Sequence, residues 1–594
     1  MRGCPPTGPL AAGKHAGRNR PQLVELMEKY LLGAVASGAS RFALVLLLVM
    51  ACDAIGAVRH VDANSAAPVP PYTNWATAAR VIQDAVDLAA AGDEIVVTNG
   101  VYASGGRAMN WATNRVAVTA PIAVRSVNGA AVTIIQGFGV SGPTAVRCVY
   151  LASGATLAGF TLTNGATTGR DIFYTGIGGG VWCESRTAVV SNCVLVGNTA
   201  TSYGGGAGFG TLINCTVVGN QARESGGAET ATLIGCVLTG NYAASSAGAA
   251  YGSMLSHCTV TSNTARFYGG GTVGGTLTNC TLMGNAVANA SGSGNGGGAT
   301  SDSTLWNCTL IGNSVTNGRG GGAWGGKLVN CVLLGNYAVS TTNYPAFGGG
   351  SSGGWLRNCT LLGNSAGYGG GSASGTLENC ILNFNSATNG ANYYFINPKN
   401  CCTTPQPNAG VGNITNAPIF VDYVGGDLHL QSNSPCINAG NNAYAPSSTD
   451  LGDEARIVSG TVDIGAYEFQ GPGSAISYAW LQQYGLPTDG SVDLTDPDAD
   501  RLNTWQEWRC QTDPTNALSV LRLLPPSFDG TNRVVTWASV PEVWYSLERS
   551  TNLSANPPFT LLSTSLRGQT NTTSFTDTNA ALPPQLFYRV GVGY

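Results

Sequence analysis

Carboxylates at regular spacing stand out in the last fifth of this 594-residue chain. Asp496, Asp498, Asp500 and Glu507 occupy positions 1, 3, 5 and 12 of a twelve-residue segment. Twelve-residue calcium loops use this spacing, and a backbone carbonyl at position 7, here that of Leu502, completes the ligand set. The segment therefore predicts a structural Ca²⁺ site made by these five residues. A solvated acidic turn without a metal ion is the alternative.

The same segment resembles the Asp-rich calcium loops of dockerins and thrombospondin type 3 repeats. Arg501 departs from that pattern, because it stands where such loops need glycine for a sharp turn, and it adds a positive charge. The resemblance implies a structural role for the ion, which would stiffen the joint between the parts of the chain on either side.

A second group of charged residues could carry out acid–base chemistry. Glu184, Arg186, Arg223, Glu224 and Glu229 lie close in sequence within a region that is otherwise poor in charge. Glycoside hydrolysis needs two or three neighbouring carboxylates. If the chain is an enzyme, we expect Glu184, Arg223, Glu224 and Glu229 to form its site. Solvated loop charges are the simpler interpretation.

Aromatic residues are scattered through the same region and could stack on sugars if their rings are exposed. Their offsets from the repeated cysteines described below differ, so packing under loops is the alternative. The candidates are Tyr203, Phe209, Tyr251, Phe267, Tyr268, Trp306, Trp324, Trp355 and Tyr368.

These residues sit on a repeat that runs from Cys193 to Cys380, with cysteine returning every 21 to 28 residues. An aliphatic residue stands three before each cysteine and another two after it. Strict alternation cannot place the cysteine and both aliphatic residues on one face of a flat strand. A bend just before the cysteine can, and the residue there is Asn, Gly or His, which tolerate left-handed backbone. Asn at the fifth position after each cysteine predicts a second corner, at which the Asn side chains of successive coils stack.

A period of about 22 residues with two corners predicts a parallel β-helix with three short strands per coil. Glycine-rich runs separate most copies. We expect the ladder cysteines to be buried free thiols, because strands ~4.8 Å apart hold their Cβ atoms too far apart for disulfides. Cys401, Cys402 and Cys436 lie outside the predicted ladder and could pair.

Composition excludes several classes of function. The net charge is −4 and charged residues make up 10%, so the chain has no basic field for nucleic acid.

The apolar run at 42–51 is too short to span a bilayer and has the length of a signal-peptide core. We expect an exported chain with a leader at 1–57 and no transmembrane span after cleavage. Lipidation at Cys52 is the alternative anchoring route.

The chain divides into six predicted parts. The segment at 58–93 contains an amphipathic helical pattern at 79–90 that can cap the solenoid, as exposed solenoid ends require. The β-helix follows at 94–394, an irregular segment at 395–470, and a linker with the acidic loop at 471–519. Alternating strands at ~10-residue spacing predict a small β-sandwich, fibronectin-like, at 520–594.

The helical cap, the Ala91-Gly92-Asp93 turn and the Asn–Cys coils resemble bacterial right-handed parallel β-helix repeat proteins. The alternating glycine signals also resemble repeats of chlamydial polymorphic outer-membrane proteins. The segment at 395–470, with its motifs Asn413 to Asp422, Ser434 to Gly440 and Val462 to Phe469, resembles the choice-of-anchor Q domain found at the end of such solenoids. The resemblance is specific for the fold, which hosts lyases, hydrolases, adhesins and tailspikes.

We therefore expect a monomeric, exported, non-enzymatic protein of the bacterial cell surface that serves in adhesion or in binding a polysaccharide or another surface ligand. A carbohydrate-active β-helix enzyme, either a polysaccharide lyase or a glycoside hydrolase, is the alternative. The two differ in whether a cleft gathers at least two carboxylates, or a carboxylate with a basic residue.

Overall fold

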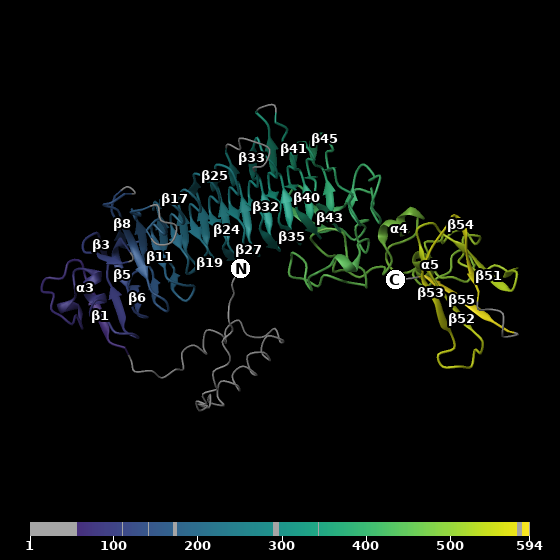
Figure 1. Cartoon of the computed structure of the whole chain (residues 1–594), viewed down its shortest axis with the longest axis horizontal. Coiled ribbons are helices and arrows are strands. Elements are labelled where there is room, and N and C mark those ends of the chain that lie inside the picture. The colour runs from purple at the N-terminus through teal and green to yellow at the C-terminus, as the bar shows by residue number, and fades with distance from the viewer. Residues whose placement is uncertain are drawn as a thin grey trace, which may run out of the picture. The chain divides into compact units, whose positions relative to one another are not determined.

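The computed structural model describes residues 56–592 except 110, 140–141, 170–174, 289–295, 342–343 and 579–584. The apolar run at 42–51 and Cys52 lie outside these residues. Within the described part, no helix is both long enough and apolar enough to cross a membrane. Residues 56–594 form one compact unit, and its main body is a parallel β-helix (Figure 1).

Three parallel sheets of thirteen strands each, counted over the described residues, form the walls of the β-helix. Sheet A contains β1 (Val58–Val61), β2 (Glu94–Val97), β6 (Ala123–Ser126), β9 (Thr156–Ala158), β12 (Val189–Ser191), β15 (Thr211–Ile213), β19 (Thr232–Ile234), β23 (Met254–Ser256), β27 (Thr276–Thr278), β31 (Thr304–Trp306), β35 (Lys327–Val329), β39 (Trp355–Arg357) and β43 (Thr376–Glu378). Sheet B contains β3 (Gly100–Tyr102), β7 (Thr133–Gln136), β10 (Thr161–Thr163), β13 (Val194–Val196), β16 (Thr216–Val218), β20 (Val237–Thr239), β24 (Thr259–Thr261), β28 (Thr281–Met283), β32 (Thr309–Ile311), β36 (Val332–Leu334), β40 (Thr360–Leu362), β44 (Ile381–Asn383) and β47 (Cys402–Thr403).

Sheet C is the third wall of the β-helix. It contains β4 (Arg107–Met109), β5 (Ala112–Val118), β8 (Val146–Leu151), β11 (Val181–Cys183), β14 (Ala207–Gly208), β18 (Ala228–Glu229), β22 (Ala250–Tyr251), β26 (Thr272–Val273), β30 (Thr300–Ser301), β34 (Ala323–Trp324), β38 (Ser351–Ser352), β42 (Ser372–Ala373) and β46 (Tyr393–Tyr394). Only β4 and β5 pair antiparallel; the other pairings in this sheet are parallel.

The prediction of three strands per coil is wrong for the middle of the solenoid, where a fourth short strand forms between the second corner and the glycine run. These strands make sheet D, which contains β17 (Gln221–Ala222), β21 (Tyr242–Ala243), β25 (Thr264–Ala265), β29 (Ala286–Val287), β33 (Ser314–Thr316), β37 (Tyr337–Val339), β41 (Ser365–Tyr368) and β45 (Ser386–Asn389). Most of these strands have only two or three residues, which is too short to show an alternating pattern in the sequence.

Both predicted corners are confirmed. The residue before each ladder cysteine has positive φ, from 48° at Asn358 to 61° at Gly235. At the second corner, the Asn residues form a buried ladder along the axis. For example, Asn263 donates from its backbone N and its Nδ2 to Oδ1 of Asn285, at 3.1 and 3.0 Å. Each Asn therefore satisfies polar groups of the next coil, and the coils are held in register.

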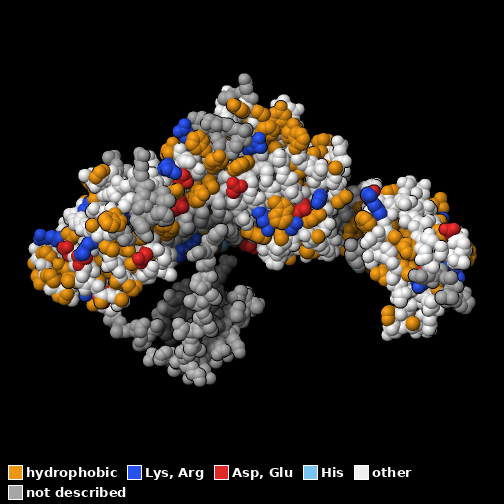
Figure 2. All heavy atoms as spheres, viewed as in Figure 1, with side chains coloured by type: hydrophobic (Ala, Val, Ile, Leu, Met, Phe, Trp, Pro, Cys, Tyr) orange, Lys and Arg blue, Asp and Glu red, His pale blue; other side chains and the backbone are white. Residues whose placement is uncertain are grey.

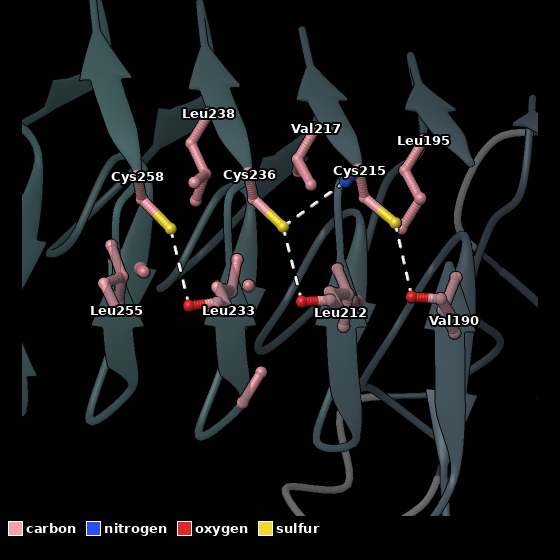
Figure 3. Close-up of a cluster of buried hydrophobic side chains, with 14 of the residues drawn as sticks. Val190, Leu195, Leu212, Cys215, Val217, Leu233, Cys236, Leu238, Leu255 and Cys258 are labelled. Carbon is pink, nitrogen blue, oxygen red and sulfur yellow. Dashed lines mark hydrogen bonds between the residues drawn. The ribbon is translucent and has the colours of Figure 1, made fainter. Parts of the chain in front are cut away.

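The ladder cysteines are buried free thiols, as predicted (Figure 3). The Sγ atom of Cys236 lies 3.4 Å from the carbonyl oxygen of Leu212, and it accepts a hydrogen bond from the backbone N of Cys215, also at 3.4 Å. Burial raises the pKa of the Cys193 thiol to about 11. A thiol with such a pKa stays protonated at neutral pH and behaves as a small hydrophobic side chain.

Two expectations about the remaining cysteines are wrong. Cys401 belongs to the ladder, since its Sγ accepts from the backbone N of Cys380 at 3.3 Å. Cys401, Cys402 and Cys436 are all free thiols, so no disulfide joins them. Cys402 and Cys436 instead pack with Ile381 in one apolar cluster at the end of the β-helix, where apolar contacts and no covalent bond hold them together.

The N-terminal end of the solenoid is covered by helix α3 (Ile82–Val86), which follows the 3₁₀ turn η3 (Trp75–Thr77). Ile82, Ala85 and Val86 are buried, so the apolar side of the predicted pattern faces the core. Gln83 is also buried, and its Oε1 accepts from the backbone N of Ala117 at 2.6 Å. The helix thereby closes the first coil.

After the β-helix, hairpin β48 (Phe420–Asp422) and β49 (Asp427–Leu430) and the 3₁₀ turn η4 (Asn442–Tyr444) lead to helices α4 (Tyr478–Gln483) and α5 (Thr504–Cys510). Two three-stranded antiparallel sheets follow and share one core around Trp537 and Tyr545, which makes a small β-sandwich. One sheet contains β50 (Ser527–Asp529), β51 (Asn532–Ser539) and β54 (Asn571–Asp577), and the other β53 (Thr560–Arg567), β52 (Trp544–Ser550) and β55 (Phe587–Val592).

Candidate functional site

Aromatic side chains form two columns on the outer side of sheet C, on either side of the glycine runs. Along each strand of this sheet, small residues such as Ala207 and Ala228 point inward and are fully buried. Alternation places the next residue outward. Strand pairing puts these outward residues in one column, and isolated bridges align the residue before each glycine run in another. The rings of the two columns, which we call the aromatic face, are Tyr150, Trp182, Tyr251, Trp324 and Tyr394, and Tyr203, Tyr268, Phe347 and Tyr368.

Neighbouring rings of the aromatic face touch one another. Phe347 stacks on Tyr368 with ring centroids 5.1 Å apart, and Tyr368 lies 5.1 Å from Tyr394. Tyr268 stacks on Trp324 at 5.8 Å. Tyr150 and Trp182 at the N-terminal end are buried, whereas the other rings are half-buried or exposed. The ring contacts of the middle and C-terminal coils therefore form two groups, one of Tyr268 with Trp324 and one of Phe347, Tyr368 and Tyr394. Arg319 and Ser352 occupy column positions between the two groups.

Offsets from the preceding cysteine hid this arrangement, because insertions between that cysteine and the glycine run change the spacing. Counted back from the following cysteine, Tyr203, Tyr268, Phe347 and Tyr368 each lie 12 residues before it. The glycine run itself carries the signal. The residue before the first glycine is Tyr203, Tyr268, Phe347 or Tyr368 in four coils, and Trp182 or Trp324 stands two residues after the third glycine in two others. Aligning the repeat on Gly-Gly-Gly would have predicted both columns. Phe209, another candidate, lies directly after the first column.

Three of the predicted aromatic residues lie elsewhere. Trp306 and Trp355 belong to sheet A, where Lys327 Nζ lies 4.9 Å and 4.7 Å from their ring centroids. Arg357 also lies over Trp355, at 4.0 Å. Phe267 lies beside Arg266 at 5.0 Å. These rings take part in cation–π contacts and do not extend the aromatic face.

A cavity of about 240 Å³ opens in the aromatic face and contains two of the predicted carboxylates. Glu224 and Glu229 line it together with the rings of Tyr203, Phe209 and Tyr251. Glu224 occupies the column of Tyr203, and Glu229 pairs across the sheet with Tyr251. Arg223 forms an ion pair with Glu224, with Nη2 and Oε1 3.1 Å apart. The structure thus gathers three members of the predicted cluster.

Glu229 is the most perturbed of these groups. Its side chain is largely buried, and burial raises its pKa to about 7, while hydrogen bonds from Ser225 and Thr230 act in the opposite direction. The nearby Glu224 raises it further.

Glu184 does not line this cavity. It accepts a hydrogen bond from the backbone N of Ser153 at 2.9 Å and lies 3.4 Å from the hydroxyl of Tyr150. Arg186 lies nearer to Met254, with Nη1 3.5 Å from the sulfur. The placement of Glu184 is explained by the loop after β11, which turns it toward the previous coil. Both residues therefore stabilise neighbouring turns.

The acidic loop gathers its three aspartates. Ligand oxygens of Asp496, Asp498 and Asp500 lie within 4.8 Å of one another. Arg501 has φ of 84°, the left-handed conformation for which such loops use glycine, and its side chain is exposed. Its backbone N donates to Asp496 Oδ2 at 2.9 Å. The loop therefore makes the required turn despite the arginine.

Glu507 of helix α5 is not part of this three-residue group, although its carboxyl group lies near enough to be affected by the charges of Asp498 and Asp500. Its side chain is fully buried, and its Oε2 atom lacks a hydrogen-bond partner, as do Oδ2 of Asp498 and Oδ2 of Asp500. Burial raises the pKa of Glu507 to about 8, and the charges of Asp498 and Asp500 add to this. Buried carboxylate oxygens without partners are costly unless a cation satisfies them. The residues present fit a Ca²⁺ ion.

Comparisons with known proteins agree with the architecture. No family model matches the sequence, and no curated protein matches it. Three similar solved structures are a pectate lyase, Pel9A (TM-score 0.34, 15% identity, 69% of this chain and 96% of that chain), the Dettilon tailspike protein (0.29, 14%, 57% and 68%) and a rhamnogalacturonan lyase (0.25, 12%, 73% and 99%). The chain is a right-handed parallel β-helix protein. At these TM-scores the likeness carries no argument about its ligand.

Proposed function

We propose that the protein is an exported cell-surface β-helix protein that binds a polysaccharide along its aromatic face. The observation that carries the proposal is the pair of aromatic columns on sheet C, with contacts from Tyr268 to Tyr394. Aromatic rings bury large apolar areas, and a sugar ring offers a flat apolar face to them. Because rings recur along the columns, a long polysaccharide chain can make several such contacts with the protein.

Charged residues make up 10% of the chain, which favours a ligand that is recognised by stacking more than by ion pairs. In Figure 2, scattered Lys, Arg, Asp and Glu side chains lie among mostly uncharged ones on the side of the β-helix that is in view. Glu224 and Arg319 are the charged members of the second column, and the guanidinium of Arg319 lies 5.0 Å from the ring centroid of Phe347. Export, attachment through a choice-of-anchor Q-like segment, and a structural Ca²⁺ ion in the acidic loop are parts of the same proposal.

A second function, glycoside hydrolysis, is favoured by the cavity in the aromatic face. Glu229 has the raised pKa of a general acid, and Glu224 lines the same cavity with Arg223 beside it. In this reaction Glu229 would protonate the glycosidic oxygen while Glu224 takes a proton from the attacking water, so the bond is hydrolysed without a cofactor. This cavity meets the criterion given above for an enzyme, because it gathers two carboxylates with a basic residue beside them. Binding without cleavage is kept as the primary proposal because the aromatic face extends over many coils beyond this cavity.

A panel of purified polysaccharides separates the two functions. The full chain is incubated with immobilised neutral and acidic polysaccharides, and both retention and released reducing ends or unsaturated uronides are measured. We expect retention by at least one polysaccharide and no released product. Release that Glu229→Gln abolishes would replace the binding function by hydrolysis, and retention by none would contradict both.

A further inference from the structure

A second cavity lies far along the chain from the aromatic face. It has a volume of about 610 Å³, and its walls come from residues 400–416, residues 438–440, and helices α4 and α5. Eight side-chain amides and two indole rings give the lining its chemical character. Among them are Gln406, Asn416, Gln483, Gln511, Trp480 and Trp508.

The walls of this cavity are joined by direct contacts. The backbone N of Tyr478 at the start of α4 donates to the carbonyl of Ile437 at 3.1 Å, and Tyr478 is 1% exposed. Gln482 Nε2 donates to the carbonyl of Asn433 at 2.9 Å. Trp480 on α4 and Trp508 on α5 belong to one apolar cluster. The cavity is therefore a built feature and has the size of ordinary small-molecule sites.

The chemistry of the lining is unusual because no charged side chain contributes to it. The side chains of Gln406, Asn416 and Gln483 are exposed and form no hydrogen bond within the described part of the protein. Each amide offers two donors and one acceptor oxygen. Trp480 and Trp508 add flat apolar surfaces. Amides that can exchange hydrogen bonds with hydroxyl groups, beside indole rings, suit a ligand with both hydroxyls and apolar ring faces.

We infer that this cavity binds a short segment of a neutral saccharide, as a site separate from the aromatic face. A charged ligand would find no counter-charge in the lining, and a purely apolar ligand would leave the amides without partners, which is costly on desolvation. A neutral saccharide needs no counter-charge, and its hydroxyl groups exchange hydrogen bonds with the amides.

Calorimetric titration of the full chain with neutral hexasaccharides tests this inference, with maltohexaose, cellohexaose, xylohexaose and mannohexaose as probes and hexagalacturonate as the acidic comparison. We expect saturable binding of at least one neutral probe and at least tenfold weaker binding of hexagalacturonate. The double variant Gln406→Ala/Gln483→Ala, whose side chains are exposed, should weaken the neutral probe at least tenfold without changing the melting temperature.

Two controls make the result specific. Gln221→Ala/Gln569→Ala removes two other exposed glutamines and should leave the affinity unchanged. Phe347→Ala/Tyr368→Ala removes rings of the aromatic face and should also leave it unchanged, so failure of the cavity and failure of the aromatic face can be told apart. Absence of binding by all neutral probes, or equal affinity in the Gln406→Ala/Gln483→Ala variant, would overturn the inference.

Discussion

Single residues of the repeat divide into those that hold the coils together and those that face solvent. Asn285 shows the first kind, since its Nδ2 donates to the carbonyl of Val260 at 2.8 Å and to Oδ1 of Asn313 at 2.9 Å. Cys280, 2% exposed, belongs to the same group. Because such residues recur at fixed positions, the sequence predicts them well, yet they perform no chemistry.

Substitution of one ladder cysteine tests this division. Cys280→Ser replaces a buried thiol by a hydroxyl that carries a larger desolvation cost, so the free energy of unfolding should fall by about 1–3 kcal/mol if the hydroxyl finds no partner. Urea unfolding measures the change. In addition, native protein should resist a thiol reagent at Cys280 and react after denaturation. Rapid labelling of native Cys280 would contradict the buried ladder.

The raised pKa of Glu229 has a consequence for stability. Its pKa is about 7 in the folded chain and its ordinary value is 4.5, so the folded state binds the proton more tightly. The stabilisation from this group is fully present below pH ~4.5 and is lost as pH rises through 7. The urea midpoint of the wild type, relative to that of Glu229→Gln, should fall between pH 5 and 8. Exposed Glu454→Gln should show no such trend. An identical difference between the urea midpoints of the wild type and of Glu229→Gln at pH 5 and at pH 8 would refute the raised pKa of Glu229.

At the scale of elements, prediction succeeded where the residue type restricts the backbone. Asn, Gly or His before each cysteine requires a corner, and Asn at +5 requires a second. Cys401 was missed because position +5 is Gln406, since the chain leaves the solenoid there and needs no further corner. Asn400 before it, with φ of 49°, was the available signal. Sheet D was missed because its strands are too short to show a pattern.

The acidic loop and helix α5 form one element whose order should depend on calcium. Ca²⁺ would satisfy the unpartnered oxygens of Asp498, Asp500 and Glu507 and bind only the folded loop, so it should raise the melting temperature of the full chain. Calorimetry should show saturable uptake that Asp496→Ala and Glu507→Gln abolish.

Asp529→Asn changes an exposed aspartate of β50 and serves as the control, with uptake and stabilisation retained. The absence of both heat and thermal stabilisation at millimolar Ca²⁺ in the wild type would show that the loop binds no calcium.

At the scale of the whole molecule, the β-helix was predicted from its period, whereas the aromatic face was not. The face exists only because strand pairing brings residues from successive coils side by side, and irregular coil lengths concealed this in the sequence. Glu184, Glu224 and Glu229 were predicted to form one cluster because they lie close in sequence. Glu224 and Glu229 do lie together, but a turn directs Glu184 to the preceding coil. Function on a solenoid therefore depends on the register of its coils.

The affinity of aromatic-face variants for a bound polysaccharide tests the central claim most directly. Phe347→Ala/Tyr368→Ala removes two stacked rings from the face, and Tyr242→Ala/Tyr337→Ala removes two exposed tyrosines from sheet D as a matched control. Calorimetry with the polysaccharide retained in the panel should show at least tenfold weaker binding for the first variant, about 1.4 kcal/mol, and no change for the second. Equal affinities for wild type and both variants would contradict binding along the aromatic face.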